Sequence, residues 1–314
     1  MEDARKNYSM KIRKLLQEEK PASRALYEEM FYEDSKGFVD YYYTEKTKDN
    51  DIYVCGNPMV SMVQLNPYVM MINGGEVNTH YIVAVATRPE ERRKGYMAAL
   101  LTTAMEEMRK AGEPFTFLMP AKEAYYTPFG FRTVYRQDLL YVDVDTYKGE
   151  EVEDFEEQAI LANAGLSTYQ VYVKRSTAYY ERLSKELASE DGKLLKADQT
   201  ISAQRCIPAV KEVPEALGNI MIRILDVKKM LERMKAKEEI SLRIFVEDPL
   251  LKENEGCYEI HAEKDAFLKV EKVEKEEDIR MTIEELQLSL FGKKEVEKLS
   301  NIQPLTKIYL NEIV

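Results

Sequence analysis

The chain is organised around the stretch Val83-Ala84-Val85-Ala86-Thr87-Arg88-Pro89-Glu90-Glu91-Arg92-Arg93-Lys94-Gly95-Tyr96-Met97. Its first part is a run of β-branched and small apolar residues, which predicts a strand that ends before the proline. Apolar residues at helical spacing follow the glycine, namely Met97, Leu100, Leu101, Ala104, Met105 and Met108. The pattern therefore predicts a strand, a basic turn and a helix that ends near Gly112.

A basic turn of this kind favours a bound phosphate. Free N–H groups at the start of a helix, the positive end of its dipole and flanking Arg and Lys side chains all attract an anion. The alternative is that the cations are merely solvated, because R-x-x-G by itself is a short and common pattern.

Composition bounds the class of protein. With 314 residues, of which 45% are hydrophobic and 32% charged, the chain is long enough for two or three domains of an ordinary soluble protein. The first residues are charged, and no apolar run approaches the roughly 18 residues of a membrane span. We therefore expect a cytoplasmic protein with no membrane partner.

Metal and nucleic-acid chemistry are not indicated. The three cysteines, Cys55, Cys206 and Cys257, are widely spaced, and the histidines are His80 and His261. This pattern predicts neither a disulfide framework nor a metal site. A net charge of −11 argues against nucleic-acid binding, but it suits the attraction of small cations if the acids line a cleft.

The N-terminal part combines expected helices with an antiparallel meander. Residues 1 to about 45 have helical spacing, and their aromatic run Tyr41-Tyr42-Tyr43 belongs either to the core or to the wall of a substrate cleft. Strands are expected over residues 52–55, 59–65, 68–72, 77–86 and 115–119, with a break at Pro67 and a hairpin turn at Asn73-Gly74-Gly75. The crossover helix makes the last two strands parallel.

The basic turn resembles the acetyl-CoA loop of GNAT-type N-acetyltransferases, whose pattern is V-x-x-x-P-x-x-R-x-x-G-x-[GA]. Met97 stands where that pattern has Gly or Ala. The resemblance implies a mixed sheet in which two parallel strands splay apart, with the pantetheine arm of acetyl-CoA on the opened edge. It implies a coenzyme site formed by Val85, Ala86, Thr87, Arg92, Arg93, Lys94, Gly95, Tyr96, Met97, Ala98, Ala121 and Lys122.

A second motif, Tyr126-Thr127-Pro128-Phe129-Gly130-Phe131, resembles the GNAT segment that presents a tyrosine before the last strand of the domain. When an amine attacks the thioester, a phenol near the sulfur can protonate the departing thiolate. The alternative is that Tyr126 only packs against the sheet and donates one structural hydrogen bond.

The second half of the chain is expected to contain several further strands and helices and a linker. A strand over residues 139–144 is expected to close the first domain, and helices are expected over residues 156–164 and 176–187. A strand near Gly192 and a weakly patterned linker over residues 199–218 come next. The last unit combines strands over residues 220–225, 242–246, 256–261 and 266–270 with helices over residues 227–234 and 283–291.

Taken together, the order of units resembles the Eis (enhanced intracellular survival) acetyltransferases and their relatives. The resemblance rests on the two motifs above, on Ile-Met-Ile-Arg-Ile-Leu at residue 220 and on the terminal Asn-Glu-Ile-Val. It implies α/β and α+β domains, namely a GNAT domain over 1–146, a second GNAT-like region over 147–218 and a sterol-carrier-protein-like (SCP2-like) domain over 219–314. The middle region is too short for a complete GNAT domain, so we expect it to be reduced.

The resemblance also implies that the C-terminal carboxylate of Val314 is the catalytic base, and it implies a homo-oligomer, a hexamer in the family. Our leading hypothesis is an N-acetyltransferase that uses acetyl-CoA as co-substrate and a small amine as acceptor, with an aminoglycoside, a polyamine or lysine as candidates. The acidic balance favours a polycationic acceptor. The alternative is a non-catalytic acetyl-CoA sensor or a protein that binds an apolar ligand.

Overall fold

We describe residues 11–137, 141–143, 149–196, 204–207 and 218–312 of a computed structural model. Within them, the N-terminal part is built on a large mixed sheet with the strand order β1-β2-β3-β4-β5-β11-β6, and β8 pairs with β3 and β18 with β8. The strands are β1 (Ile12–Lys14), β2 (Asp51–Cys55), β3 (Ser61–Ile72), β4 (Gly75–Thr87), β5 (Phe115–Leu118), β6 (Arg132–Arg136), β8 (Val171–Val173), β11 (Asn219–Ile224) and β18 (Ile308–Tyr309).

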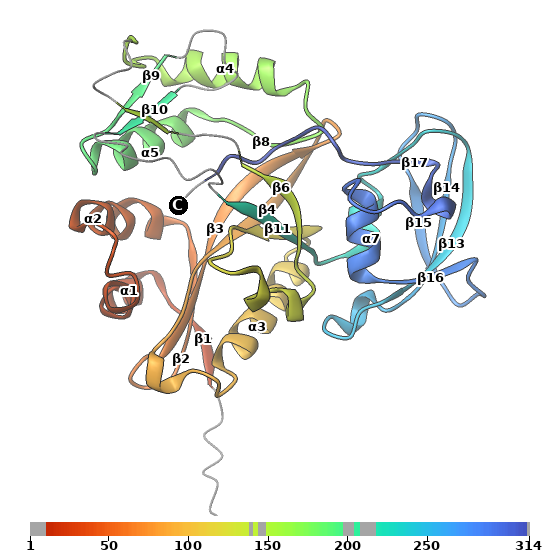
Figure 1. Cartoon of the computed structure of the whole chain (residues 1–314), viewed down its shortest axis with the longest axis horizontal. Helices are drawn as coiled ribbons and strands as arrows, with labels where there is room; N and C mark the ends of the chain where they lie inside the picture. Colours follow the sequence, from red (N-terminus) through yellow and green to blue (C-terminus); the bar gives the residue numbers. More distant parts are fainter. Residues whose placement is uncertain (1–10, 138–140, 144–148, 197–203, 208–217, 313–314) are drawn as a thin grey trace, which may run out of the picture.

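Helices cover both faces of this sheet (Figure 1). α1 (Arg24–Met30) and α2 (Lys36–Glu45) lie on one face, and α3 (Tyr96–Lys110) lies on the other. The alternation along β2 explains this arrangement, because successive side chains of a strand point to opposite faces. Ile52 and Val54 pack with the first helices, whereas Tyr53 and Cys55 pack with α3. The aromatic run of α2 is core at Tyr41 and Tyr42, which are 5% and 1% exposed.

The middle region contains α4 (Phe155–Leu166), α5 (Thr177–Ala188) and a small sheet with the order β7-β10-β9. Its strands are β7 (Tyr141–Asp143), β10 (Gln204–Ile207) and β9 (Lys193–Leu195). The helices expected here are confirmed. The strand near residue 139 was expected to close the first domain, but β7 pairs in parallel with β10 in the small sheet instead. Backbone pairing across a long stretch of intervening chain is not visible in local sequence.

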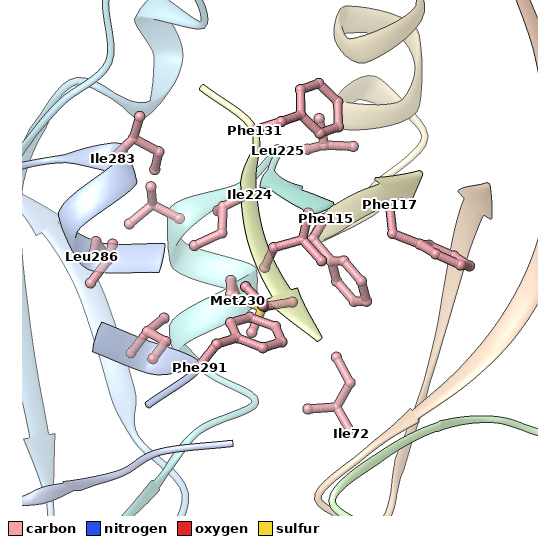
Figure 2. Packing of buried hydrophobic residues seen from close by; sticks show 14 of the residues in the cluster. Ile72, Phe115, Phe117, Phe131, Ile224, Leu225, Met230, Ile283, Leu286 and Phe291 are labelled. Carbon is pink, nitrogen blue, oxygen red and sulfur yellow. The ribbon is translucent and has the colours of Figure 1, made fainter. Parts of the chain in front are cut away.

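The C-terminal unit contains a sheet with the order β15-β14-β13-β16 and two helices. Its elements are α6 (Val227–Leu231), β12 (Lys235–Ala236), β13 (Ile240–Glu247), β14 (Gly256–Ala262), β15 (Lys269–Val273), β16 (Ile279–Thr282), α7 (Ile283–Leu290) and β17 (Ile302–Gln303). Figure 2 shows how Ile283, Leu286 and Phe291 approach Ile224 and Phe115 of the large sheet. One apolar core therefore joins the C-terminal unit to the sheet.

β11 differs from the sequence expectation in its place. The strand is confirmed, but it lies antiparallel between β5 and β6 in the large sheet rather than in the C-terminal unit. From Ile220 onward its residues are all buried, which is typical of a strand covered on both faces. The domain limits 1–146, 147–218 and 219–314 stay a prediction, with β11 contributed to the N-terminal sheet from beyond residue 218.

Two smaller expectations are also corrected. The helical structure expected from residue 1 onward is wrong at Ile12–Lys14, which forms the edge strand β1 and pairs with β2. The break at Pro67 is absent, because β3 runs from Ser61 to Ile72 and Pro67 pairs with His80 inside it. The hairpin turn is confirmed, since Asn73 and Gly74 have φ values of 48° and 84° between β3 and β4.

Candidate active site

The turn between β4 and α3 has the geometry of an anion site. Gly95 has a φ of 89° and precedes the first residue of α3, and no side chain of the described residues caps this helix. The N–H groups of its first turn, at Tyr96, Met97 and Ala98, therefore have no partner within the helix. The side chains of Arg92, Arg93 and Lys94 are exposed around them. The expected strand, turn and helix are confirmed.

The cations of this turn differ in their contacts. Arg92 Nε donates to the carbonyl oxygen of Thr87 at 3.2 Å, and Lys94 Nζ lies 3.0 Å from the carboxylate of Glu91. Arg93 has a φ of 62°, in the left-handed region that residues with a side chain rarely adopt. Strained backbone of this kind gathers at ligand-binding turns. The strained backbone and the exposed cations make this turn a candidate ligand site, and the binding roles of Arg92, Arg93 and Lys94 stay a prediction.

The splay between the two parallel strands is present. β4 and β5 pair at Tyr81 and Phe117, which is their one pair in the described chain, and β4 then continues to Thr87. A bulge precedes Val85, because Ala84 has a φ of 48° and the register with β3 shifts there. Beyond Tyr81, the edge of β4 that faces β5 has no further strand pair among the described residues. Val85, Ala86 and Thr87 lie on this part of the strand, and their role in binding stays a prediction.

Tyr126 lies close behind the splay. It is 8% exposed, and its ring meets that of Phe131 edge to face at 6.0 Å between centroids. Burial raises the pKa of this phenol to about 12. Tyr126 therefore keeps its proton throughout the neutral range. Both interpretations of the sequence survive, because the ring is packed and the hydroxyl is able to donate.

The turn that carries Tyr126 is fixed by a buried arginine of β11. Arg223 Nε donates to the carbonyl oxygen of Phe129 at 2.9 Å, and its Nη2 contacts both oxygens of Asp248 at 2.6 and 2.7 Å. Gly130 has a φ of 81°, and a Cβ there would lie 2.7 Å from Arg223 Nε. The glycine of the motif is therefore required by both backbone and space. Ala121 and Lys122 are exposed just after β5, and Lys122 Nζ lies 6.0 Å from the ring centroid of Tyr125.

Val314 lies outside the described residues, but the chain just before it is anchored to the large sheet. After β17 the chain leaves the C-terminal unit and runs back to the sheet, where β18 pairs in parallel with β8 (Figure 1). Gln137 Nε2 donates to the carbonyl oxygen of Glu312 at 2.7 Å, and the Tyr135 hydroxyl donates to Asn311 Oδ1 at 2.9 Å. The tail is thus held against the end of β6.

A cavity of about 330 Å³ opens beside this tail. It is lined by Asn66 to Val69 of β3, by Val173 and Lys174, by side chains of α5 and by Glu312. Its position follows from strand pairing, because β3 pairs with β2 up to Leu65 and with β8 from Met70. The residues between those two pairings, from Asn66 to Val69, form one wall of the cavity. Pro67, which has no N–H to donate, lies in this gap.

Sequence reasoning missed this cavity. Pro67 in the middle of a strand pattern was the available signal, since proline is tolerated where a strand edge is unpaired. The cavity and the splay are close neighbours. Burial raises the pKa of Tyr81, and the nearby Tyr68, Glu312 and Tyr126 raise it further. Tyr81 at the splay is therefore within electrostatic range of two cavity residues and of the candidate acid.

The described residues show neither a metal-binding cluster nor a membrane-spanning helix. No group of three or more His, Cys, Asp or Glu side chains in that part of the chain is arranged to hold a metal ion. No helix there combines the length and apolarity needed to cross a membrane.

Two family models match separate parts of the chain. Residues 11–134 match the family model of the acetyltransferase (GNAT) domain, and residues 227–312 match that of the sterol carrier protein domain. No significant match is found among curated proteins. The cofactor expected from the sequence, acetyl-CoA, is the co-substrate of GNAT acetyltransferases.

Several solved structures share the fold of nearly the whole chain. A probable N-acyltransferase from Enterococcus faecalis V583 has a TM-score of 0.71 at 16% identity, with 94% of each chain covered. A GCN5-related N-acetyltransferase from Anabaena variabilis ATCC 29413 has 0.68 at 17%, covering 96% of this chain and 98% of that one. Eis1 from Mycobacterium abscessus has 0.65 at 13%, covering 94% and 93%. The fold class predicted from the sequence is confirmed.

Proposed function

We propose that the protein is an N-acetyltransferase that moves the acetyl group of acetyl-CoA to a primary amine by direct attack in a ternary complex. The observation that carries this proposal is the position of Tyr81. It marks the point where β4 and β5 part, its ring centroid lies 6.3 Å from that of Tyr68 in the cavity lining, and the basic turn follows at the end of the same strand. The coenzyme would enter the splay, and the amine would enter from the cavity.

The reaction needs positioning above all, since holding the thioester beside the amine makes a bimolecular step local. The new N–C bond forms as the C–S bond breaks, the amine gives up a proton and the sulfur gains one. The N–H groups at the start of α3 and the cations of the turn would bind the phosphates. The edge of β4 at Val85 and Thr87 would hold the pantetheine arm, although the Thr87 carbonyl oxygen accepts from Arg92 in this structure.

Tyr126 is our proposed proton donor to the departing sulfur. Its pKa of about 12 lies above the value of about 8.5 for an ordinary cysteine thiol. The phenol therefore holds its proton more tightly than such a sulfur and would act first by a hydrogen bond to the developing thiolate. The carboxylate of Val314 is our proposed base for the amine, supported by the anchoring of Asn311 and Glu312 at the sheet.

We further propose a functional kinship with the Eis acetyltransferases and a homo-oligomeric assembly. The shared architecture with Eis1 supports the first point, and light scattering on the purified chain tests the second. Candidate acceptors are an aminoglycoside, a polyamine and lysine. The alternative is a sensor that binds acetyl-CoA without turnover, or a protein that binds an apolar ligand in its C-terminal unit.

Thiol release from acetyl-CoA tests the proposal directly. The purified chain is mixed with acetyl-CoA and with each member of a panel of aminoglycosides, polyamines and lysine peptides, and the free thiol is titrated. Release that depends on the amine supports the transferase. Tight binding of acetyl-CoA without release for any amine favours the sensor instead.

A further inference from the structure

The cavity beside the C-terminal tail carries charges of both signs. Among its described lining residues are four carboxylates and three cations, which are Asp49, Glu76, Glu186, Glu312, Lys46, Lys174 and Arg182. The lining therefore has only a small excess of acid, and the extra carboxylate, Glu312, is itself paired with Arg175 outside the lining. The acceptor has to be matched to this local set of charges.

The deep charges are fixed in pairs. Lys46 lies 3.3 Å from Glu186, and both side chains are 9% exposed. The Tyr41 hydroxyl also donates to Glu186, at 3.1 Å. Glu312 lies 2.6 Å from Arg175, and both side chains are 2% exposed. These buried pairs are costly to break, because separating them leaves a charge without a partner away from water.

The charges at the mouth are paired more loosely. Arg182 contacts Asp49 through Nη1 and Nη2 at 3.1 and 2.9 Å, and Lys174 contacts Glu76. The two side chains of the first pair are 29% and 47% exposed, and those of the second are 44% and 55% exposed. Exposed pairs of this kind contribute little to stability, so a ligand can exchange places with one partner.

We propose that the acetyl acceptor is a compact zwitterion, an amine that carries a carboxylate of its own, such as an amino acid or a dipeptide. This inference rests on the proposed N-acetyl transfer. Each carboxylate of the cavity already faces a cation, so a polycation would meet Lys46, Lys174 and Arg182 without gaining an uncommitted acid. A zwitterion brings one positive and one negative charge, so it adds no net charge to the paired groups of the cavity. A volume of about 330 Å³ is at the lower end for ligand sites, which suits a small acceptor.

Arg182 is the group that binds the carboxylate of the acceptor. A guanidinium has five N–H donors in a planar fork, and Asp49 uses the two N–H groups described above. The remaining donors can hold a second carboxylate, or the ligand can replace Asp49. Lys46 is less available because it is buried against Glu186. Arg182 is also within electrostatic range of Tyr41 and Tyr68, which places it over the cavity wall.

The amine of the acceptor then lies on the side of Glu312, which lines the cavity and is within electrostatic range of Tyr81 at the splay. Tyr68 lies between the two charged ends of the ligand, since it is within range of Arg182 and its ring centroid is 6.3 Å from that of Tyr81. An amine there is directed towards the thioester, whereas its carboxylate remains at Arg182. The cavity thus orients the acceptor by its two charges.

Matched pairs of amines test the inference. Initial rates of thiol release are measured with lysine against cadaverine and with tyrosine against tyramine, each pair differing by one carboxylate. A charge-assisted hydrogen bond to Arg182 predicts a kcat/KM about 10- to 100-fold higher for the carboxylated member. Arg182→Gln should bring this ratio close to 1, and Arg182→Lys should restore part of it.

The control variant is Lys185→Gln on the same helix. Lys185 is exposed and pairs with Glu45 outside the cavity, so its loss should leave the ratio unchanged. Binding of CoA by calorimetry reports whether each variant is folded. Higher kcat/KM for cadaverine and tyramine, or an unchanged ratio in folded Arg182→Gln, overturns the zwitterion inference while leaving N-acetyl transfer in place. No transfer to these amines or to the wider panel overturns the proposed function itself.

Discussion

The guanidinium of Arg175 lies 2.6 Å from the carboxylate of Glu312, and both side chains are 2% exposed. The Tyr179 hydroxyl also donates to Glu312, at 2.8 Å, and the guanidinium lies 4.3 Å from the centroid of the Tyr179 ring. The pair joins residues 137 positions apart in the chain. It therefore links the C-terminal tail to the segment just before α5, beside the cavity.

Removal of one partner of this pair should destabilise the fold strongly. Arg175→Met leaves Glu312 buried without its cation, and we expect the free energy of unfolding in urea to fall by about 3–5 kcal/mol. The double variant Arg175→Met/Glu312→Leu should recover most of this loss, because no charge is then stranded. The matched control is Lys110→Met, whose pair with Glu107 is 66% and 46% exposed and should contribute at most about 1 kcal/mol. Equal losses in the single and the double variant would show that the charge is not the cause.

The two ends of α3 allow a similar comparison at the anion site. Gly95 before the helix and Gly112 after it have φ values of 89° and 92°. Alanine at either position should cost about 1–2 kcal/mol of stability, because a side chain is disfavoured in the left-handed region. Only Gly95→Ala should raise the KM for acetyl-CoA, since that glycine shapes the turn at the helix start. Steady-state kinetics at saturating amine measure this, and an equal rise for Gly112→Ala would remove the anion site from the proposal.

Tyr126→Phe separates the two interpretations of that residue. As a proton donor it should lower kcat by about 10²–10⁴-fold and leave the KM for acetyl-CoA unchanged. Because its pKa is raised to about 12 by burial, the wild-type rate should show no loss from Tyr126 ionisation up to about pH 10. The control is Tyr125→Phe, a neighbour that is 52% exposed. A kcat within about twofold of wild type would show that Tyr126 only packs against the sheet, because the loss of a catalytic acid lowers the rate far more than that.

Buried phenols also predict how stability depends on pH. Burial raises the pKa of Tyr53 and of Tyr126 to about 12, whereas an unfolded tyrosine has a value of about 10. The unfolded chain therefore loses these protons first, and stability should fall as pH rises from about 10 through 12. Urea unfolding at a series of alkaline pH values measures the slope. Tyr53→Phe should make it shallower, while Tyr125→Phe should not.

Local pattern was sufficient for the strand, the basic turn and the helix, whereas the splay was expected only from the family resemblance. The apolar run of β4, the proline, the cations and Gly95 are contiguous, so their chemistry and spacing appear together in the sequence. The same holds for the turn at Tyr126, where Gly130 needs a positive φ. Elements that depend on one short stretch are the ones that sequence reasoning places well.

Long-range pairing explains what was missed. β11 is close in sequence to the C-terminal unit, but it pairs with β5 and β6 of the large sheet, where its residues from Ile220 onward are buried. The cavity collects residues of β3, β8, α5 and the tail, and of these segments only the tail, with Asn-Glu-Ile-Val, contains a motif that the sequence analysis used. Pro67 had two possible meanings, a break between strands or an unpaired edge within one, and only the pairing of β3 with β2 and β8 decides between them.

A short C-terminal extension tests the carboxylate of Val314 as the base. If the carboxylate of Val314 accepts a proton from the amine, directly or through one water, extending the chain by Gly-Ser moves that carboxylate and should lower kcat. The loss should shrink as pH rises towards about 10.4, the ordinary pKa of an alkyl ammonium, because the free amine then no longer needs a base. An equal extension at the N-terminus is the control. A Gly-Ser variant with wild-type kcat throughout the neutral range would exclude the C-terminal carboxylate, and the search for the base would move to the carboxylates that line the cavity.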